Sequence, residues 1–210
     1  MYSTEPTDKK QFTQKFDQVY GRLAKVYDVI VKLFPLWRNW ISQAVPHIRG
    51  PRVLEISFGT GYLLTQYADD YETYGIDYNW TLACTAQRNL ERTGTKAFLQ
   101  HADVAHLPYR SGMFNTVVNT MAFTGYPDGK KAMTEVHRVL QRNGRFVLID
   151  INYPQNHNWL GMKMTQFWAS TGDIIRDMGQ LLEETGFHYQ DEEVGGFGSV
   201  HLYVATKKDD

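Results

Sequence analysis

The residues best suited to chemistry surround a glycine turn, Ser57-Phe58-Gly59-Thr60-Gly61, which follows a short apolar segment. Glycine accepts positive φ angles and has no Cβ, so Gly59 and Gly61 allow a tight turn and a close approach by a ligand. A helix that begins behind such a turn presents free backbone N–H groups to a bound molecule. The turn therefore predicts a small-molecule site whose ligand must be identified from the neighbouring residues.

Two phosphate-binding interpretations of this turn are disfavoured. A P-loop needs Gly-x-x-x-x-Gly-Lys-Ser/Thr, and no lysine follows these glycines. A dinucleotide-binding turn needs a third glycine in Gly-x-Gly-x-x-Gly, but Leu64 stands at that position. An NAD-dependent oxidoreductase is therefore a weak alternative that stays open.

The elements that must position this turn alternate between strands and helices, which predicts βαβ units and a parallel sheet. Apolar runs at 116–118 and 146–149 are typical of strands buried on both faces. The expected strands are 52–57, 72–77, 96–100, 114–121 and 145–152, with helices at 60–68, 80–92 and 128–140. We expect the substrate pocket to lie over the carboxyl ends of these strands.

Before the first strand, an apolar stripe from Phe12 to Phe34 has helical spacing, and Pro35 ends or kinks that helix. The first ten residues are expected to be frayed. The predicted organisation is a helical extension or lid at 1–50 and a compact binding domain at 51–210, with no linker between them.

After the last parallel strand we expect a helix over 173–185 and strands over 187–194 and 200–206. The connection Gly195-Gly196-Phe197-Gly198 is short, so these two strands should form a hairpin. The sheet is therefore expected to end with an antiparallel strand.

Three acids stand near the ends of successive expected strands. Glu55 lies in the strand before the glycine turn, Asp77 ends the next strand, and Asp103 follows the third. Two further blocks continue the pattern, Phe114–Val118 and Glu135–Arg145. With these motifs in order, the chain resembles the class I S-adenosylmethionine-dependent methyltransferases over about residues 52–151, and especially the branch containing ubiquinone and menaquinone C-methyltransferases. Ser57 departs from the family, which usually has glycine there.

The resemblance implies an α/β, Rossmann-like, doubly wound sheet of seven strands, mostly parallel, with an antiparallel C-terminal hairpin strand and an N-terminal helical lid. It also implies S-adenosylmethionine as the cofactor, and that molecule has no phosphate for a lysine to bind. In this interpretation Asp77 binds the ribose hydroxyls, Asp103 the adenine amino group, and Glu55 the turn or the methionine amino group. The predicted cofactor-binding residues are Glu55, Ser57, Gly59, Thr60, Gly61, Asp77, Tyr78, Asp103, Val104, Asn119 and Thr120.

The same resemblance implies transfer of a methyl group to a small, apolar or aromatic acceptor. Methyl transfer from a sulfonium is an in-line displacement, so the protein mainly aligns the acceptor and excludes water. The predicted substrate residues are Tyr20, Tyr27, Met121, Trp159 and Phe167. If the acceptor must lose a proton, the candidate bases are Tyr27, Asp150 and His157.

Composition bears on the remaining function classes. With 22 Lys and Arg against 23 Asp and Glu, the chain lacks the basic bias of a general nucleic-acid binder. Cys84 is the single cysteine and the histidines lack ligand spacing, so no metal site is expected. The polar N-terminus and short apolar runs predict a cytoplasmic protein without stable membrane insertion. Oligomeric state stays open, as does a non-catalytic cofactor-binding or interaction protein with the same fold.

Overall fold

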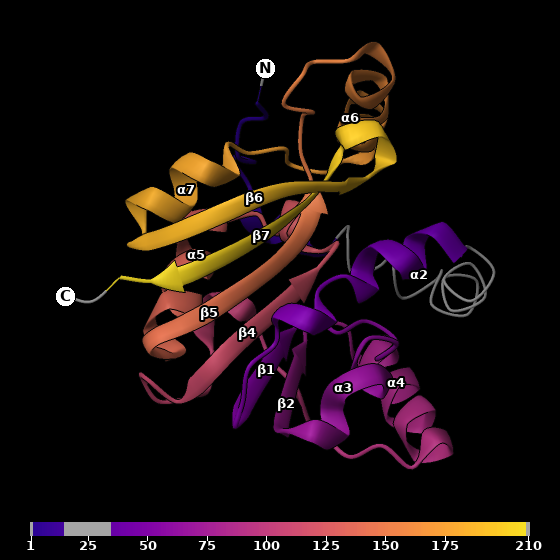
Figure 1. Cartoon of the computed structure of the whole chain (residues 1–210), viewed down its shortest axis with the longest axis vertical. Coiled ribbons are helices and arrows are strands. Elements are labelled where there is room, and N and C mark those ends of the chain that lie inside the picture. The colour runs from indigo at the N-terminus through magenta and orange to yellow at the C-terminus, as the bar shows by residue number, and fades with distance from the viewer. Residues whose placement is uncertain (1, 15–34, 209–210) are drawn as a thin grey trace.

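The computed structural model describes residues 2–14 and 35–208, and its strands form one seven-stranded sheet in the order β3-β2-β1-β4-β5-β7-β6 (Figure 1). The strands are β1 (Arg52–Ile56), β2 (Glu72–Asp77), β3 (Phe98–His101), β4 (Phe114–Thr120), β5 (Leu140–Ile151), β6 (Phe187–Gly195) and β7 (Val200–Lys207). β7 runs antiparallel to both of its neighbours, whereas the other pairs are parallel. The predicted fold class, a mostly parallel doubly wound sheet closed by an antiparallel hairpin strand, is confirmed.

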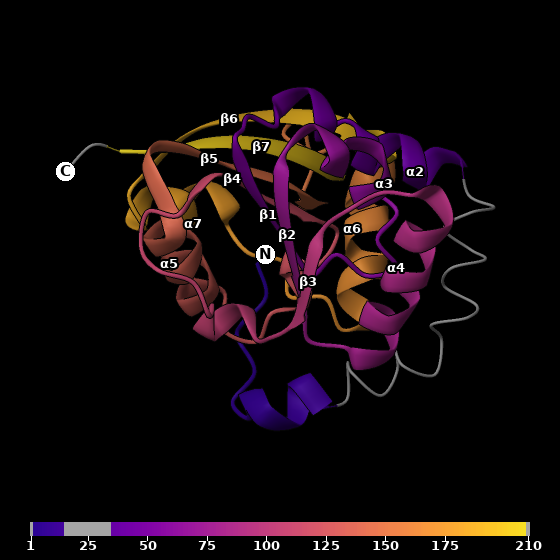
Figure 2. The same cartoon turned by 90° about the horizontal axis from the view of Figure 1, so that it is seen from below.

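Helices cover both faces of this sheet (Figure 2). They are α2 (Pro35–Ser42), α3 (Leu64–Tyr67), α4 (Trp80–Thr93), α5 (Gly129–Val139), α6 (Trp159–Thr171) and α7 (Met178–Glu184). α5 and α7 pack on one face, and α2, α3 and α4 on the other. Val117 and Val118, adjacent in β4, belong to these two different cores. Burial on both faces explains why the parallel strands are continuously apolar.

Most of the longer helices begin at an Asn or Asp whose side chain accepts a hydrogen bond from a backbone N–H of the first turn. These N-caps are Asn79 for α4, Asp128 for α5, Asn158 for α6 and Asp177 for α7. Such caps satisfy donors that have no partner within the helix. They fix where each helix starts relative to the strand before it.

Two predicted helices are shorter than expected. The predicted helix 60–68 is α3, Leu64–Tyr67, because Gly61 has a φ of +75° and cannot lie in a right-handed helix. The predicted helix 173–185 is α7, Met178–Glu184. Its first residues are instead held to other segments, since Ile174 N donates to Thr124 O at 2.8 Å.

The N-terminal segment is packed against the sheet domain, so the prediction that residues 1–10 are frayed is wrong for residues 2–10. Ser3 N donates to Ile175 O at 2.7 Å, and Ile175 N donates to Ser3 Oγ at 3.1 Å. Residues 9–14 are helical. The division at residue 50 stays a prediction. In the described part of the chain, no helix is both long and apolar enough to cross a membrane.

Candidate functional site

A cavity of about 500 Å³ opens at the carboxyl ends of the central strands. Nine predicted cofactor-binding residues line it, namely Glu55, Ser57, Gly59, Thr60, Asp77, Tyr78, Asp103, Val104 and Thr120. The strand order reverses between β1 and β4, and a crevice forms at such a switch point because the connections leave on opposite faces. The topology therefore brings together residues that lie far apart in the sequence.

Asp77 ties the glycine turn to the end of β2. Its Oδ2 accepts from Gly59 N at 2.8 Å, and its Oδ1 accepts from Asn79 N at 2.8 Å. Each carboxylate oxygen has a second lone pair, so Asp77 can still accept hydrogen bonds from a ligand. Gly59 has a φ of +56°, and nothing lies within 4 Å of the position that a Cβ would occupy. The backbone at Gly59 is thus open to a close approach.

Glu55 is a buried acid beside Asp77, with 2% of its surface exposed. Tyr67 donates its hydroxyl to Glu55 Oε2 at 2.8 Å. Burial raises the pKa of Glu55 to about 8, against the opposing effect of the Tyr67 hydrogen bond, and the charge of Asp77 adds to the rise. Glu55 therefore holds a proton at neutral pH, and a cationic ligand group at this end of the cavity would favour its ionised form.

Ser57 adopts the backbone conformation that favours glycine, with a φ of +55°. Its Oγ lies 2.7 Å from the hydroxyl oxygen of Tyr126, which also accepts from Asn119 Nδ2 at 2.9 Å. This contact accounts for the side chain at a position where the family usually has glycine. Tyr126 lines the cavity but was missed by the sequence analysis. Its position six residues after the carboxyl end of β4 is the one feature of the sequence that could have pointed to it.

The rim formed by β2 and β3 carries the residues predicted at the adenine end. Tyr78 is 46% exposed, and its carbonyl accepts from His101 Nε2 at 2.6 Å. Asp103 caps the 3-10 turn Val104–His106, where its Oδ1 accepts from Ala105 N at 2.8 Å. Its other oxygen remains at the cavity side, 3.5 Å from His106 Nδ1. No cluster of three or more metal-ligating side chains occurs within residues 2–14 and 35–208.

Two predicted cofactor contacts, Gly61 and Asn119, lie outside the described cavity wall. Gly61 does not line the cavity, because it packs against α4, where a Cβ would lie 3.0 Å from both Ala86 Cβ and Leu90 Cδ1. Asn119 is fully buried, and its amide donates to Ile56 O as well as to Tyr126. Gly61 thus packs the turn against α4, Asn119 holds the strand before the turn, and a contact of either residue with the cofactor stays a prediction.

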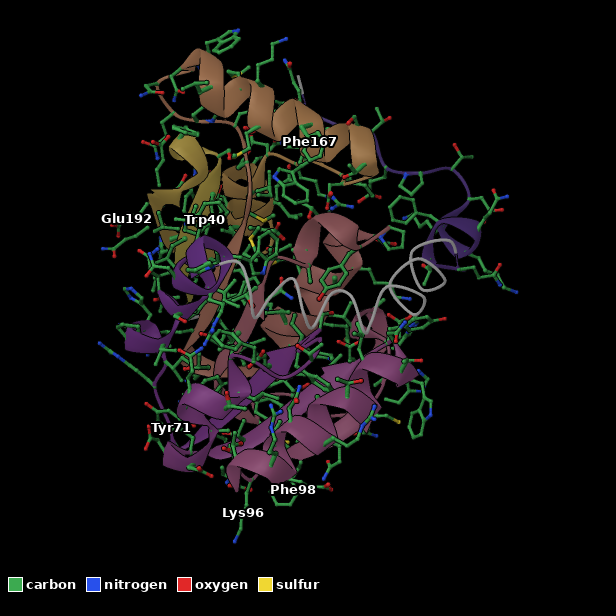
Figure 3. The ribbon with its side chains drawn as sticks, turned by 90° about the vertical axis from the view of Figure 1, so that its right-hand side faces the viewer. Trp40, Tyr71, Lys96, Phe98, Phe167 and Glu192 are labelled. Atoms are coloured by element: carbon green, nitrogen blue, oxygen red, sulfur yellow. The ribbon has the colours of Figure 1, made fainter. Side chains whose placement is uncertain are left out.

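The predicted substrate residues have three different outcomes. Met121 lines the cavity, whereas Tyr20 and Tyr27 lie outside the described residues. Trp159 and Phe167 are 69% and 60% exposed on α6 and do not line the described cavity, so their contact with a substrate stays a prediction. Figure 3 labels Phe167 beside α6. α6 fully buries only Gly161 and Thr165, and Trp168 and Ala169 pack partly against the core.

Other segments form the end of the cavity that faces away from the glycine turn. Its walls come from the N-terminal segment, α2, the connection between β4 and α5, and the connection after α6. The lining residues there include Lys9, Lys10, Thr13, Trp37, Ile41, Gly125, Tyr126, Asp128 and Asp173. Described residues before β1 thus line this end of the cavity, and their role as a lid stays a prediction.

Neither described candidate base reaches the cavity. Asp150 is 1% exposed and accepts from Ile151 N at 2.7 Å and Thr124 N at 3.0 Å, beneath the lining. His157 lies exposed in the loop before α6. Asp173, which does line the cavity, carried no sequence signal because it lies 22 residues beyond the end of β5.

Comparison with known proteins agrees with this architecture. Residues 54–148 match the family model of a methyltransferase domain. The demethylmenaquinone methyltransferase of Thermus thermophilus is 28% identical over 144 residues, which cover 65% of this chain and 66%, just under two thirds, of that protein. Its counterpart in Symbiobacterium thermophilum is 24% identical, with 97% of this chain and 95% of that one covered. A phosphatidylethanolamine N-methyltransferase of Cereibacter sphaeroides is 29% identical over 49% of this chain and 51% of its own.

Solved structures share the fold at lower identity. An S-adenosylmethionine-dependent methyltransferase from Aquifex aeolicus has a TM-score of 0.66 at 17% identity, covering 88% of this chain and 97% of its own. The [4+2]-cyclase SpnF has a TM-score of 0.75 at 16% identity, with 98% of both chains covered. Because a protein described as a cyclase has this architecture, the architecture alone does not determine the reaction.

Proposed function

We propose that the chain is a class I S-adenosylmethionine-dependent methyltransferase and that it transfers a methyl group from S-adenosylmethionine to a small, apolar or aromatic acceptor. The observation that carries this proposal is the arrangement around Asp77, whose carboxylate joins an open glycine turn to the end of β2. Glu55 places a second carboxyl group beside it. The match to a methyltransferase domain over 54–148 supports the same assignment.

The cofactor fits the donors and acceptors present at this end of the cavity. S-adenosylmethionine, when bound, supplies an electrophilic methyl group on a sulfonium sulfur. Asp77 would accept from its ribose diol, and Asp103 with Val104 would hold the adenine. Glu55 would face a cationic part of the molecule, for which its ionised form is suited. The turn needs no lysine, because this cofactor carries no phosphate.

The acceptor we propose is an aromatic molecule of the quinol type. Trp37, Ile41, Met121 and Tyr126 supply apolar and aromatic surface at the far end of the cavity. Two relatives act on demethylmenaquinone by name, and a third, matched over half its length, acts on phosphatidylethanolamine. Tyr20 and Tyr27 remain predicted acceptor contacts within a stretch that the structure does not describe.

Titration calorimetry with S-adenosylmethionine and, separately, with NADH tests this proposal. We expect binding of S-adenosylmethionine alone, followed by transfer of a labelled methyl group to 1,4-naphthalenediol or a related phenol. Binding of S-adenosylmethionine without transfer to any quinol, phenol or small carboxylate would favour a non-catalytic binding protein. Binding of NADH alone would favour the oxidoreductase.

A further inference from the structure

Three polar groups run in a line from the acceptor end of the cavity into the sheet. Asp173 lines the cavity, and its Oδ1 lies 2.8 Å from Thr124 Oγ1. Thr124 Oγ1 lies 3.1 Å from Asp150 Oδ1, at the end of β5. The backbone holds this line in place, because Thr124 N donates to Asp150 Oδ2 and Thr124 O accepts from Ile174 N.

The threonine hydroxyl groups around Asp173 have fewer hydrogens than the acceptor oxygens that they face. Thr124 has one hydroxyl hydrogen but faces carboxyl oxygens of both Asp150 and Asp173. Thr171 has one as well, yet its Oγ1 lies 2.7 Å from Trp168 O and 3.1 Å from Asp173 Oδ2. Both oxygens of Asp173 therefore face hydroxyl groups whose hydrogens have another acceptor. One proton on Asp173 supplies a missing donor, so the geometry is more complete when Asp173 has taken up a proton.

Other titratable side chains of the described cavity wall are less suited to accept a proton from an acceptor. Asp128 is paired with Lys9 at 2.7 Å and caps α5, and the Lys9 hydrogen bond helps to lower its pKa in spite of burial. Asp77 is committed to two backbone N–H groups at the opposite end. Burial raises the pKa of the Tyr126 hydroxyl far above its usual value, so that it stays protonated. Asp173 is the remaining carboxyl group at the acceptor end.

The surroundings of Asp173 favour proton uptake. Burial is the main cause that raises its pKa, against the hydrogen bonds from Thr124 and Thr171. Burial likewise raises the pKa of Asp150 to about 6, and the charge of Asp173 adds to this effect. The other charged group is Arg176, which acts on Asp150 and is itself bound to Tyr126 O, Phe123 O and Glu5. Two carboxyl groups that share one hydroxyl titrate as a pair.

We propose that Asp173 is the catalytic base that removes a proton from the methyl acceptor, and that Thr124 and Asp150 are its positioning residues. The acceptor's X–H bond breaks and the proton passes to the Asp173 carboxylate. The electron pair left on X forms the X–CH₃ bond, while the pair of the broken C–S⁺ bond stays on sulfur and neutralises it. This inference rests on the proposed function and narrows the substrate class to acceptors whose reacting oxygen carries a removable proton, as in a quinol or phenol.

Asp173→Asn is the first test, because an asparagine amide resembles the protonated carboxyl group and can donate to Thr124 or Thr171. We expect an unfolding midpoint equal to or above that of the wild type and unchanged calorimetric binding of S-adenosylmethionine. With 1,4-naphthalenediol as acceptor, kcat should fall by about 10²–10⁴-fold, the usual contribution of a general base. A purely structural role would instead lower stability and leave kcat nearly unchanged.

Thr124→Val and Thr124→Ser form a matched pair for the positioning role. Valine keeps the shape but removes the hydroxyl contacts to Asp150 and Asp173. Because the Thr124 hydrogen bond lowers the pKa of Asp173, its loss should move the acid limb of the kcat profile to higher pH, and kcat should fall about tenfold. Serine restores the hydroxyl and should restore both values.

Carboxyl NMR of protein labelled at aspartate gives a readout besides activity. With S-adenosylmethionine bound, the signals lost in Asp173→Asn should titrate above the ordinary range of aspartate in the wild type. Ordinary titration of both Asp150 and Asp173, or a kcat within threefold of wild type for Asp173→Asn, would overturn the inference. Either result, with S-adenosylmethionine binding and methyl transfer intact, would leave the proposed function standing.

Discussion

Gly59 and Gly61 stand two positions apart in one turn, and both have positive φ, yet their surroundings differ. Gly59 faces open space at the cavity, while Gly61 faces α4. We expect Gly61→Ala to lower the free energy of unfolding by about 2–4 kcal/mol, because a backbone penalty and steric overlap add together. Gly59→Ala should cost about 1 kcal/mol from the backbone alone.

The ranking of the two variants should reverse when binding is measured. Gly59→Ala puts a methyl group where the ligand approaches, so calorimetry should show the larger loss of S-adenosylmethionine affinity for this variant. Urea unfolding should show the larger loss of stability for Gly61→Ala. Equal effects of both variants on both measurements would contradict the assignment of one glycine to the ligand and the other to packing.

The raised pKa of Glu55 predicts that the protein releases protons when S-adenosylmethionine binds. Burial raises its pKa to about 8, so at pH 7 most molecules hold this proton without ligand. A bound cation favours the carboxylate, so binding should release a fraction of one proton per site. Calorimetry in two buffers of different ionisation enthalpy measures that number. Glu55→Gln, which keeps an acceptor for Tyr67, should release none and bind more weakly.

Residue types alone predict the cavity-lining residues only where the direction of each side chain can also be inferred from the sequence. The positions of Asp77 and Glu55 near the glycine turn were predictable from the sequence, while their contacts with a cofactor stay a prediction. Asn119 was placed at the ligand, although it points into the protein one residue before Thr120, which does line the cavity. Side chains alternate along a strand, so an error of one position changes the face. The sequence does not say which residue of a strand is its last.

At the scale of elements, the N-terminal segment is the part that closes over the domain. Glu5 accepts from Gly129 N at 3.1 Å, at the start of α5, and lies 3.5 Å from an Arg176 Nη. We expect Glu5→Ala to loosen this segment and to speed tryptic cleavage after Lys9 and Lys10 several-fold. Cleavage followed over time by mass spectrometry measures the effect.

Glu184→Ala is the matched control for that experiment. Glu184 pairs with Lys130 at 3.7 Å with both side chains exposed, and such pairs contribute little in water. It should leave cleavage after Lys9 and Lys10 at the wild-type rate. If both variants speed cleavage equally, the effect reflects the loss of a negative charge and not the loss of the Glu5 contacts with Gly129 and Arg176.

Elements were predictable where their pattern is local. The strand 72–77 agrees with β2 at both ends. α6 illustrates the limit, since its Trp and Phe residues suggested a pocket wall, but its fully buried residues are Gly161 and Thr165 and its Trp168 packs partly against the core. Apolar character predicts burial for most side chains, but it does not say which neighbour covers them. That information comes only from tertiary packing.

At the scale of the whole molecule, the two ends of the cavity differ in how predictable they are. The cofactor end uses residues that directly follow consecutive strands, so the strand order assembles it. The acceptor end combines Lys9, Trp37, Tyr126 and Asp173, which come from four separate segments of the chain. No spacing relates these residues in the sequence, because their meeting depends on how the N-terminal segment and the chain after α6 fold back.

The same buried acids predict how stability varies with pH. The folded pKa of Glu55 is about 8 against an ordinary 4.5, and that of Asp150 is about 6 against 3.8. Above pH 4.5 the folded protein therefore holds more protons than the unfolded chain, so the free energy of unfolding falls as pH rises toward 8. The loss should be on the order of a few kcal/mol, since one pKa unit corresponds to about 1.4 kcal/mol. Urea unfolding between pH 5 and pH 9 without ligand measures this loss.

Two controls separate the contribution of Glu55 from that of Asp150. Glu55→Gln should flatten the curve above pH 6 while leaving the part due to Asp150. Saturating S-adenosylmethionine should reduce the slope, because it stabilises the ionised Glu55. A wild-type midpoint that rises over this range would show that these carboxyl groups are ionised in the folded protein without any ligand.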